Sequence, residues 1–335
     1  MATIKVPQVV PSPADDSRTL HRAFQGVCCL VVGLGTDEKA IIRTLGRRNT
    51  AQRGLIRDTF RQLYNKSLID CLHAELSGDF RKAVILWTYD PAERDARLAN
   101  QALTSRQKGI TELQVIVEIA CAAPPHHLAA VRRAYCTLFD VSLEEDITAK
   151  APLPVQKVLV RLVSSFRFDK EAVDSSIAAM EAVKLRKAIE AVKLRKAIEA
   201  KKLDDDDELI RVLTTRNAFQ LRETFKLYKI NYGRSIDEDI MSCGKGILES
   251  LLKVVIWCID SPEKHFAEVV RAAIVGLGTD EDSLTRAIVS RAEIDMVRIG
   301  QEYLEANKTS LEEAVIGDTS WDYKDFLITL LGADI

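Results

Sequence analysis

The sequence predicts an all-helical protein that consists of four similar repeats of about five short helices each, with essentially no sheet. Apolar residues recur at helical spacing, for example at Leu221, Phe225 and Tyr228, and strict alternation over the length of a strand is absent. Four segments resemble one another, because each places a tyrosine before a polar turn and then an apolar residue that opens an acidic helix. These tyrosines, spaced by 71, 93 and 75 residues, are Tyr64, Tyr135, Tyr228 and Tyr303. Self-similarity at a fixed period is typical of repeat architectures.

Polar residues mark the expected starts of several helices. Ser67 and Ser310 each precede a leucine that opens a helical pattern, so their hydroxyls can accept a hydrogen bond from the first turn. Thr36 and Thr279 are each followed by Asp-Glu and are expected to cap helices in the same way.

The longest interval between repeats contains a tandem duplication. The segment EAVKLRKAI occurs at 181–189 and again at 190–198. Nine residues at about 100° each place the two copies half a turn apart, so Ile189 and Ile198 would face opposite sides of one helix. We therefore expect one copy to be exposed or the helix to be interrupted. The basic residues of this segment could contact anionic lipid or actin, although a solvated amphipathic extension is the simpler explanation.

Charge and cysteine usage limit the classes of partner. A net charge of −2 leaves no polybasic surface for nucleic acid, and acidic lipid would need a bridging cation or a local patch. The seven cysteines show no CxxC spacing, which favours reduced thiols in an intracellular protein. The longest apolar stretch, 27–34, is too short to span a bilayer, so we expect a cytoplasmic protein. The three tryptophans lie within or beside helical stretches, and core packing is expected for Trp87, Trp257 and Trp321.

Two nearly identical glycine-containing loops occur at the same phase of the first and fourth repeats. They read GLGTDE at 33–38 and GLGTDE at 276–281. Glycines let the backbone turn so that several carbonyl oxygens point outward at one place. Ca²⁺ prefers six to eight oxygen ligands, and carbonyls together with one carboxylate suit it. A helix–helix turn with a threonine cap is the alternative interpretation of a single loop of this kind.

A carboxylate follows each loop at a matched distance. Glu75 lies 39 residues after Thr36, and Asp318 lies 39 residues after Thr279. The second and third repeats lack both the double glycine and the acid. The residues at their corresponding positions are Lys150 and Cys243. Loop and acid are present together or missing together, which is the pattern expected of a binding site.

These features resemble the annexin family over essentially the whole chain, and the segments ATIKVP, PADD and LWTYDPAERDARLAN are similar to plant annexins. The resemblance implies a curved all-α disc with calcium loops on its convex, membrane-facing side. It also implies an N-terminal tail followed by four annexin-type repeats. Their expected ranges are 1–14 for the tail and 15–88, 89–168, 169–260 and 261–335 for the repeats.

The resemblance also implies three carbonyl ligands and one carboxylate per calcium site. In this sequence they would be Val31, Gly33 and Gly35 with Glu75, and Ile274, Gly276 and Gly278 with Asp318. One carboxylate leaves a bound Ca²⁺ with positive charge and open coordination positions, which the phosphate of an anionic phospholipid can fill. Two such sites, one in each half of the disc, would bind one surface together. The expected function is therefore calcium-dependent binding to anionic membranes, without catalysis.

The first loop departs from the fourth. Twenty residues separate Pro13 from Gly33, whereas 14 separate Pro262 from Gly276, and the extra residues fall near 27–32. A helix lengthened by under two turns or a gene-model irregularity would account for them, and an apolar segment that inserts into lipid is the alternative. Leu34 stands where plant annexins often have tryptophan.

Other activities associated with plant annexins have weaker support. The expected histidine of the first repeat is absent from Leu45–Arg48, and no GxxxxGK[ST] segment occurs, which argues against a peroxidase or a nucleotide-hydrolysing enzyme on this scaffold. Cys121 and Cys258 match a cysteine pair thought to be redox-active. A tripeptide similar to one proposed for actin binding occurs at Ile210, Arg211 and Val212. An actin-binding helical scaffold is thus a further alternative.

Overall fold

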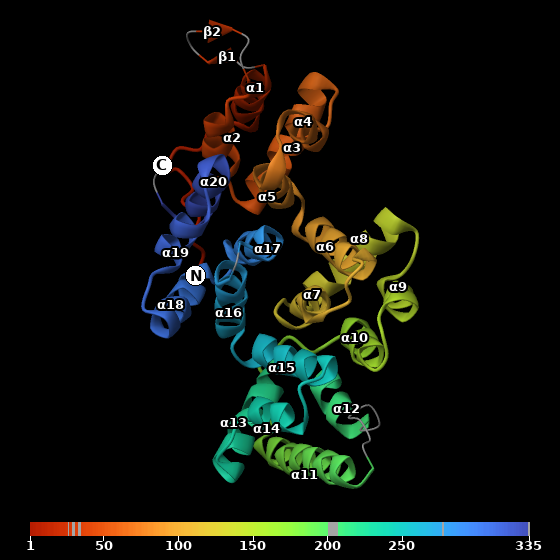
Figure 1. Ribbon diagram of the computed structural model, residues 1–335. Coiled ribbons are helices and arrows are strands. Elements are labelled where there is room, and N and C mark those ends of the chain that lie inside the picture. The colour runs from red at the N-terminus through yellow and green to blue at the C-terminus, as the bar shows by residue number, and fades with distance from the viewer. Residues whose placement is uncertain (26, 29–30, 33–34, 200–206, 277, 334–335) are drawn as a thin grey trace. The chain divides into compact units, whose positions relative to one another are not determined.

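The computed structural model describes residues 1–335 except 26, 29–30, 33–34, 200–206, 277 and 334–335 (Figure 1). The described residues form twenty helices and one two-stranded hairpin. The prediction of an all-helical fold is confirmed. The exact boundaries of the four repeats stay predictions.

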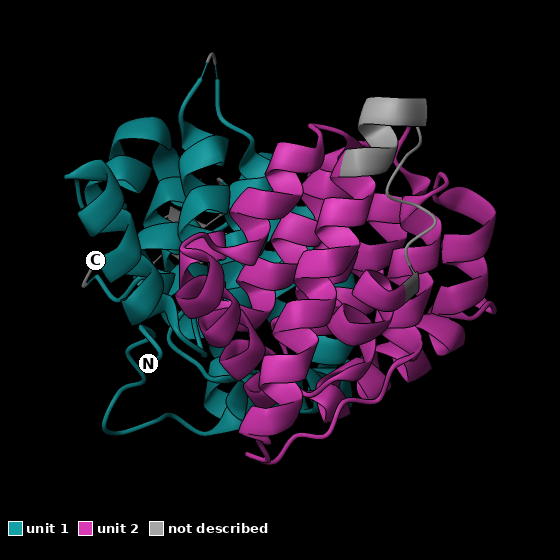
Figure 2. Ribbon diagram, turned by 90° about the horizontal axis from the view of Figure 1, so that it is seen from below, with its two compact units in different colours: residues 1–94, 266–335 teal, residues 95–265 magenta. Residues whose placement is uncertain are grey.

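The chain divides into two compact units, residues 1–94 with 266–335 (unit 1) and residues 95–265 (unit 2) (Figure 2). The helices within unit 1 are α1 (Pro13–Phe24), α2 (Glu38–Leu45), α3 (Thr50–Tyr64), α4 (Leu68–Glu75), α5 (Gly78–Thr88), α17 (Glu281–Arg291), α18 (Met296–Asn307), α19 (Leu311–Asp318) and α20 (Trp321–Leu330). Those within unit 2 are α7 (Ile110–Cys121), α8 (Pro125–Phe139), α9 (Leu143–Lys150), α10 (Val155–Ser164), α11 (Ser175–Glu199), α12 (Asp207–Thr215), α13 (Ala218–Tyr232), α14 (Ile236–Cys243) and α15 (Ile247–Asp260). The boundaries between the units fall in α6 (Pro91–Thr104) and α16 (Pro262–Ile274).

Each unit has its own apolar core. In unit 1, α5 packs on α17 and α20, and α1 packs on α3. The indole of Trp87 is buried there and donates a hydrogen bond to the carbonyl of Leu45 at 2.8 Å. In unit 2, α7 packs on α15 and α11 packs on α13. Among the described residues, no helix combines the length and apolarity that crossing a bilayer requires.

The repeat is most regular at the ends of α3, α8, α13 and α18. Each of these helices is followed by a residue in the left-handed conformation, and a serine lies directly before the first residue of the next helix. The left-handed residues, spaced by 75, 93 and 75 residues, are Asn65, Asp140, Gly233 and Lys308. When the repeats are aligned on these left-handed residues, the counterpart of the buried Tyr135, Tyr228 and Tyr303 is the buried Phe60, four residues before Tyr64. The choice of Tyr64 as the repeat marker was therefore wrong by about one helical turn.

The extra residues of the first loop do not lengthen its helix. α1 has 12 residues and α16 has 13, so the expectation of a longer helix was wrong. The insertion instead contains a short antiparallel hairpin of β1 (Val27–Cys28) and β2 (Val31–Val32). A hydrogen bond of 3.0 Å from the Asp37 amide to the Ala23 carbonyl closes the base of this loop.

The duplicated segment lies in a single helix, α11, which excludes an interruption, one of the two expected alternatives. Its first copy contributes buried residues, among them Leu185 and Ile189. The side chains of 194–199 lie outside the described residues, so the expected exposure of one copy stays a prediction.

Candidate metal centre

The fourth-repeat loop and its acid lie in contact. The hydroxyl of Thr279 donates a hydrogen bond of 2.6 Å to Oδ2 of Asp318, at the C-terminal end of α19. Gly278, the preceding residue, has a φ of +91°, which a side chain would strain. The Asp280 amide donates to the Ala273 carbonyl at 2.8 Å, which ties the start of α17 to the end of α16.

The first-repeat loop repeats this arrangement more loosely. The Thr36 hydroxyl lies 3.4 Å from the Glu75 carbonyl oxygen and 3.5 Å from its Oε2. Gly35 has a φ of +84°, close to that of Gly278. In both loops, therefore, the threonine contacts the acid that lies 39 residues after it in the sequence.

The sequence suggested that the two threonines cap helices, but in the structure the aspartates that follow them do so. Asp37 accepts a hydrogen bond from the Ala40 amide at 2.9 Å, and Asp280 accepts one from the Ser283 amide at 3.1 Å. Because each aspartate caps its helix, the threonine before it remains available to the distant acid. Ser67 and Ser310, by contrast, do cap their helices as predicted.

Val31 and Ile274 are not equivalent in the structure. Ile274 is the last residue of α16, whereas Val31 lies in β2 and pairs with Cys28. Counted from the carbonyl that accepts the closing hydrogen bond, the counterpart of Ile274 is Phe24, whereas counted back from the aspartate amide that donates it, the counterpart is Val31. Gly33 lies outside the described residues.

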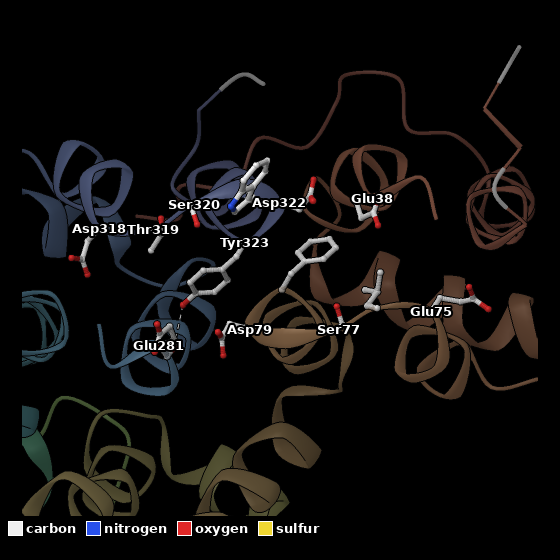
Figure 3. A pocket seen from close by; sticks show the side chains of 13 residues that line it. Glu38, Glu75, Ser77, Asp79, Glu281, Asp318, Thr319, Ser320, Asp322 and Tyr323 are labelled. Atoms are coloured by element: carbon white, nitrogen blue, oxygen red, sulfur yellow. Dashed lines mark hydrogen bonds between the residues drawn. The ribbon is translucent and has the colours of Figure 1, made fainter. Parts of the chain in front are cut away.

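A groove of about 320 Å³ in unit 1 joins the two loop regions (Figure 3). Glu75 and Asp318 lie on opposite sides of it. Six carboxyl groups line the groove, and none of its described lining residues is lysine or arginine. They are Glu38, Glu75, Asp79, Glu281, Asp318 and Asp322. Asp79 pairs with Lys82, whose side chain lies 3.1 Å away.

The additional carboxyl groups were missed from the sequence, although a signal for them is present. Glu38 and Glu281 follow Thr-Asp in the two loops, and Asp79 and Asp322 each lie four residues after the predicted acid. Glu38 and Glu281 are separated by 243 residues, as are Asp79 and Asp322, and the same separation holds between Glu75 and Asp318. The first and fourth repeats therefore each contribute three carboxyl groups to the groove, from equivalent positions.

Calcium prefers oxygen ligands, and the fourth loop and Asp318 offer such atoms. In the described part of the chain, no group of three or more His, Cys, Asp or Glu side chains is arranged to hold a metal ion. A set of backbone carbonyls and one carboxylate is not such a group, and it offers only the oxygen ligands that Ca²⁺ prefers. The hydrogen bond between Thr279 and Asp318 keeps the carboxylate beside this loop.

Comparison with known proteins identifies the family. The family model "Annexin" matches residues 16–87, 189–255 and 265–330, more than half of the chain. The chain belongs to the annexin family. It is similar to annexin D3 of Arabidopsis thaliana, with 56% identity over 100% of both chains.

Solved annexin structures share the fold. Annexin III matches with a TM-score of 0.86 and 30% identity over 100% of this chain and 98% of that one. A calcium-bound annexin, annexin (Sm)1, matches with a TM-score of 0.82 and 27% identity over 99% of this chain and 93% of that one. Family and fold support calcium-dependent phospholipid binding in general.

Unit 2 of this annexin has different chemistry at the corresponding positions. Lys150 pairs with Asp146 at 2.7 Å, and Cys243 is buried. At the start of α7, the carboxylate of Glu112 accepts a hydrogen bond of 2.9 Å from the Gly109 amide, which is an ordinary helix cap. The third-repeat loop at 201–205 lies outside the described residues. Both predicted sites thus fall in unit 1, whereas the sequence analysis placed one in each half of the molecule.

The redox and actin candidates lie in unit 2. Cys121 is half-buried, and burial raises the pKa of its thiol, which disfavours the reactive thiolate. Cys258 is buried. Ile210 and Val212 are also buried, so of the tripeptide only Arg211 is exposed, and it pairs with Glu208 at 2.8 Å.

Proposed function

We propose that this annexin binds Ca²⁺ at its first and fourth loops and thereby attaches to membranes that contain anionic phospholipid. The contact between Thr279 and Asp318, which Thr36 and Glu75 repeat, carries this proposal. It supports a site in which a glycine loop supplies neutral carbonyl oxygens and a distant helix end supplies one carboxylate.

At the fourth loop the proposed ligands are the carbonyls of Ile274, Gly276 and Gly278 together with the carboxylate of Asp318. Thr279 holds one carboxylate oxygen, which orients the acid toward the loop. At the first loop, Gly35 and Glu75 have the same roles. Gly33 stays a prediction, and the strand position of Val31 argues against that residue as a ligand.

The charge of the groove is the reason that we expect membrane binding to require a cation. Six carboxyl groups on one face repel a phosphate-rich surface, and the net charge of −2 offers no compensation. Bound calcium would supply positive charge and open coordination positions for lipid phosphate oxygens. On this proposal the protein is cytoplasmic at low calcium and peripheral on membranes when calcium rises. We propose no role with actin or nucleic acid, and no enzymatic one.

The test is sedimentation with phosphatidylserine vesicles across a calcium titration. We expect Asp318→Ala and Glu75→Ala each to shift the half-maximal calcium concentration upward by about tenfold or more, because each removes the only proposed anionic ligand of its site. The double variant should not sediment. Lys150→Ala, at the corresponding position of the second repeat, is the matched control and should bind as the wild type does. If the double variant sediments normally, the carboxylate assignment is wrong.

A further inference from the structure

Trp321 is an exposed aromatic residue beside the proposed fourth-loop site. Its side chain is 84% exposed, whereas Trp87 is buried and Trp257 is half-buried with its indole bonded to Asp237. The expectation that all three tryptophans pack in the core was therefore wrong for this one. Exposure of so large an apolar surface is unfavourable in water.

The backbone of Trp321 is strained as well. Its φ is +54°, a left-handed conformation that is an outlier for a bulky residue. The corresponding residue of the first repeat is Gly78, which also starts its helix after a serine and has a φ of +59°. Glycine adopts this conformation without steric conflict. The fourth repeat thus keeps a tryptophan where glycine would fit better, which points to a function of the side chain itself.

The surroundings of Trp321 suggest what that function is. It follows Asp318 by three residues and lines the same groove. Val275, in the loop that Thr279 holds to Asp318, is 62% exposed. Two exposed apolar side chains therefore accompany the carboxylate that would hold calcium. An indole combines an apolar body with a polar N–H and favours the boundary between headgroups and acyl chains.

We propose that Trp321 docks into this boundary of a phospholipid bilayer once calcium holds the fourth loop against the surface. The inference rests on the proposed calcium-dependent membrane binding and adds an apolar anchor to it. The carboxyl groups around Trp321 keep it away from an anionic surface until calcium is bound, so insertion depends on calcium. A bilayer is the partner that offers phosphate for the ion and an apolar layer for the indole at one place.

The first arm of the test uses Trp321→Gly, which installs the residue of the first repeat and removes the strain. We expect its thermal unfolding to occur at or above the wild-type temperature and its affinity for phosphatidylserine vesicles in calcium to fall about tenfold, as loss of a partly buried indole predicts. Phe166→Gly removes an aromatic side chain that is 73% exposed in unit 2 and should leave affinity unchanged.

The second arm follows tryptophan fluorescence. Wild-type emission should shift to shorter wavelength with vesicles and calcium together, and brominated acyl chains should quench it; Trp321→Gly should show neither effect. If Trp321→Gly binds vesicles as tightly as the wild type, or if the shift arises from self-association without vesicles, the anchor is disproved while the calcium sites stand. If wild-type protein does not sediment with vesicles in calcium, the proposed function itself fails.

Discussion

Arg53 shows how a single residue connects distant parts of the chain within unit 1. Its guanidinium lies 3.5 Å from the centre of the Trp87 ring and donates hydrogen bonds to Glu293 at 2.8 Å and to Thr50 at 3.1 Å. Burial lowers the pKa of Arg53 to about 10, and the charge of Glu293 opposes that shift, so the side chain remains charged at neutral pH. A buried cation of this kind depends on its carboxylate partner.

We therefore expect Glu293→Gln to lower the free energy of unfolding by about 3 kcal/mol, because it leaves the buried guanidinium without a counter-charge. Urea unfolding followed by circular dichroism measures the change. Asp282→Asn is the matched control, since it breaks a 2.9 Å ion pair with Lys82 in which both side chains are more than half exposed. That substitution should cost less than about 0.5 kcal/mol. Equal losses in the two variants would contradict the argument.

At the scale of helices, α11 shows what sequence periodicity leaves undecided. The duplicated segment contains mainly alanine, leucine, lysine, arginine and glutamate, all strong helix formers, so one continuous helix is favoured. Two identical copies present the same side chains, and the pattern alone does not say which copy packs. In the structure Arg186 of the first copy bonds the buried Asp239 at 2.7 Å, and Lys193 of the second reaches the same carboxylate at 3.2 Å.

Deleting 190–198 tests whether the second copy is needed. The remaining copy keeps Leu185, Arg186 and Ile189, and a lysine moves into the position of Lys193, whereas the buried Val192 is lost. We expect a loss of about 2 kcal/mol in unfolding free energy and unchanged calcium-dependent vesicle binding. Asp239→Ala removes the partner of both copies and should destabilise more, by about 3 kcal/mol. Loss of vesicle binding on deletion would instead assign membrane contact to this basic segment.

The helices and the loop–acid pairs could be predicted from the sequence, because both leave periodic signals in it. Helix starts such as Ser67 and Ser310 were predicted from local chemistry, and the pairing of Thr279 with Asp318 from a repeated spacing. The hairpin at 27–32 was not predicted, since an insertion has no counterpart in the other repeats. The exposure of Trp321 was missed because hydrophobicity predicts burial, and only the folded backbone shows that the indole faces solvent.

For the molecule as a whole, the important feature is that both proposed sites belong to unit 1 and share one groove. Glu75 and Asp318 both line it, and we therefore expect one membrane surface to engage the two sites together. When two sites bind one surface, the second binding event is intramolecular, and the affinities combine far more strongly than they would separately. Each single-site variant should therefore retain weak binding.

The same arrangement predicts reciprocal coupling between calcium and lipid. Since lipid phosphate completes the coordination of the ion, raising the phosphatidylserine fraction of the vesicles should lower the calcium concentration for half-maximal binding, by a factor on the order of 5 to 150. Thermodynamic linkage then requires calcium to raise lipid affinity by the same factor. Calcium titrations at several lipid fractions, and lipid titrations at several calcium concentrations, measure the two factors independently. Phosphatidylcholine vesicles serve as the control and should produce weaker coupling, because their headgroup carries the same phosphate but no net negative charge. Unequal factors, or a calcium midpoint that does not respond to phosphatidylserine, would show that lipid binds elsewhere than at the ion.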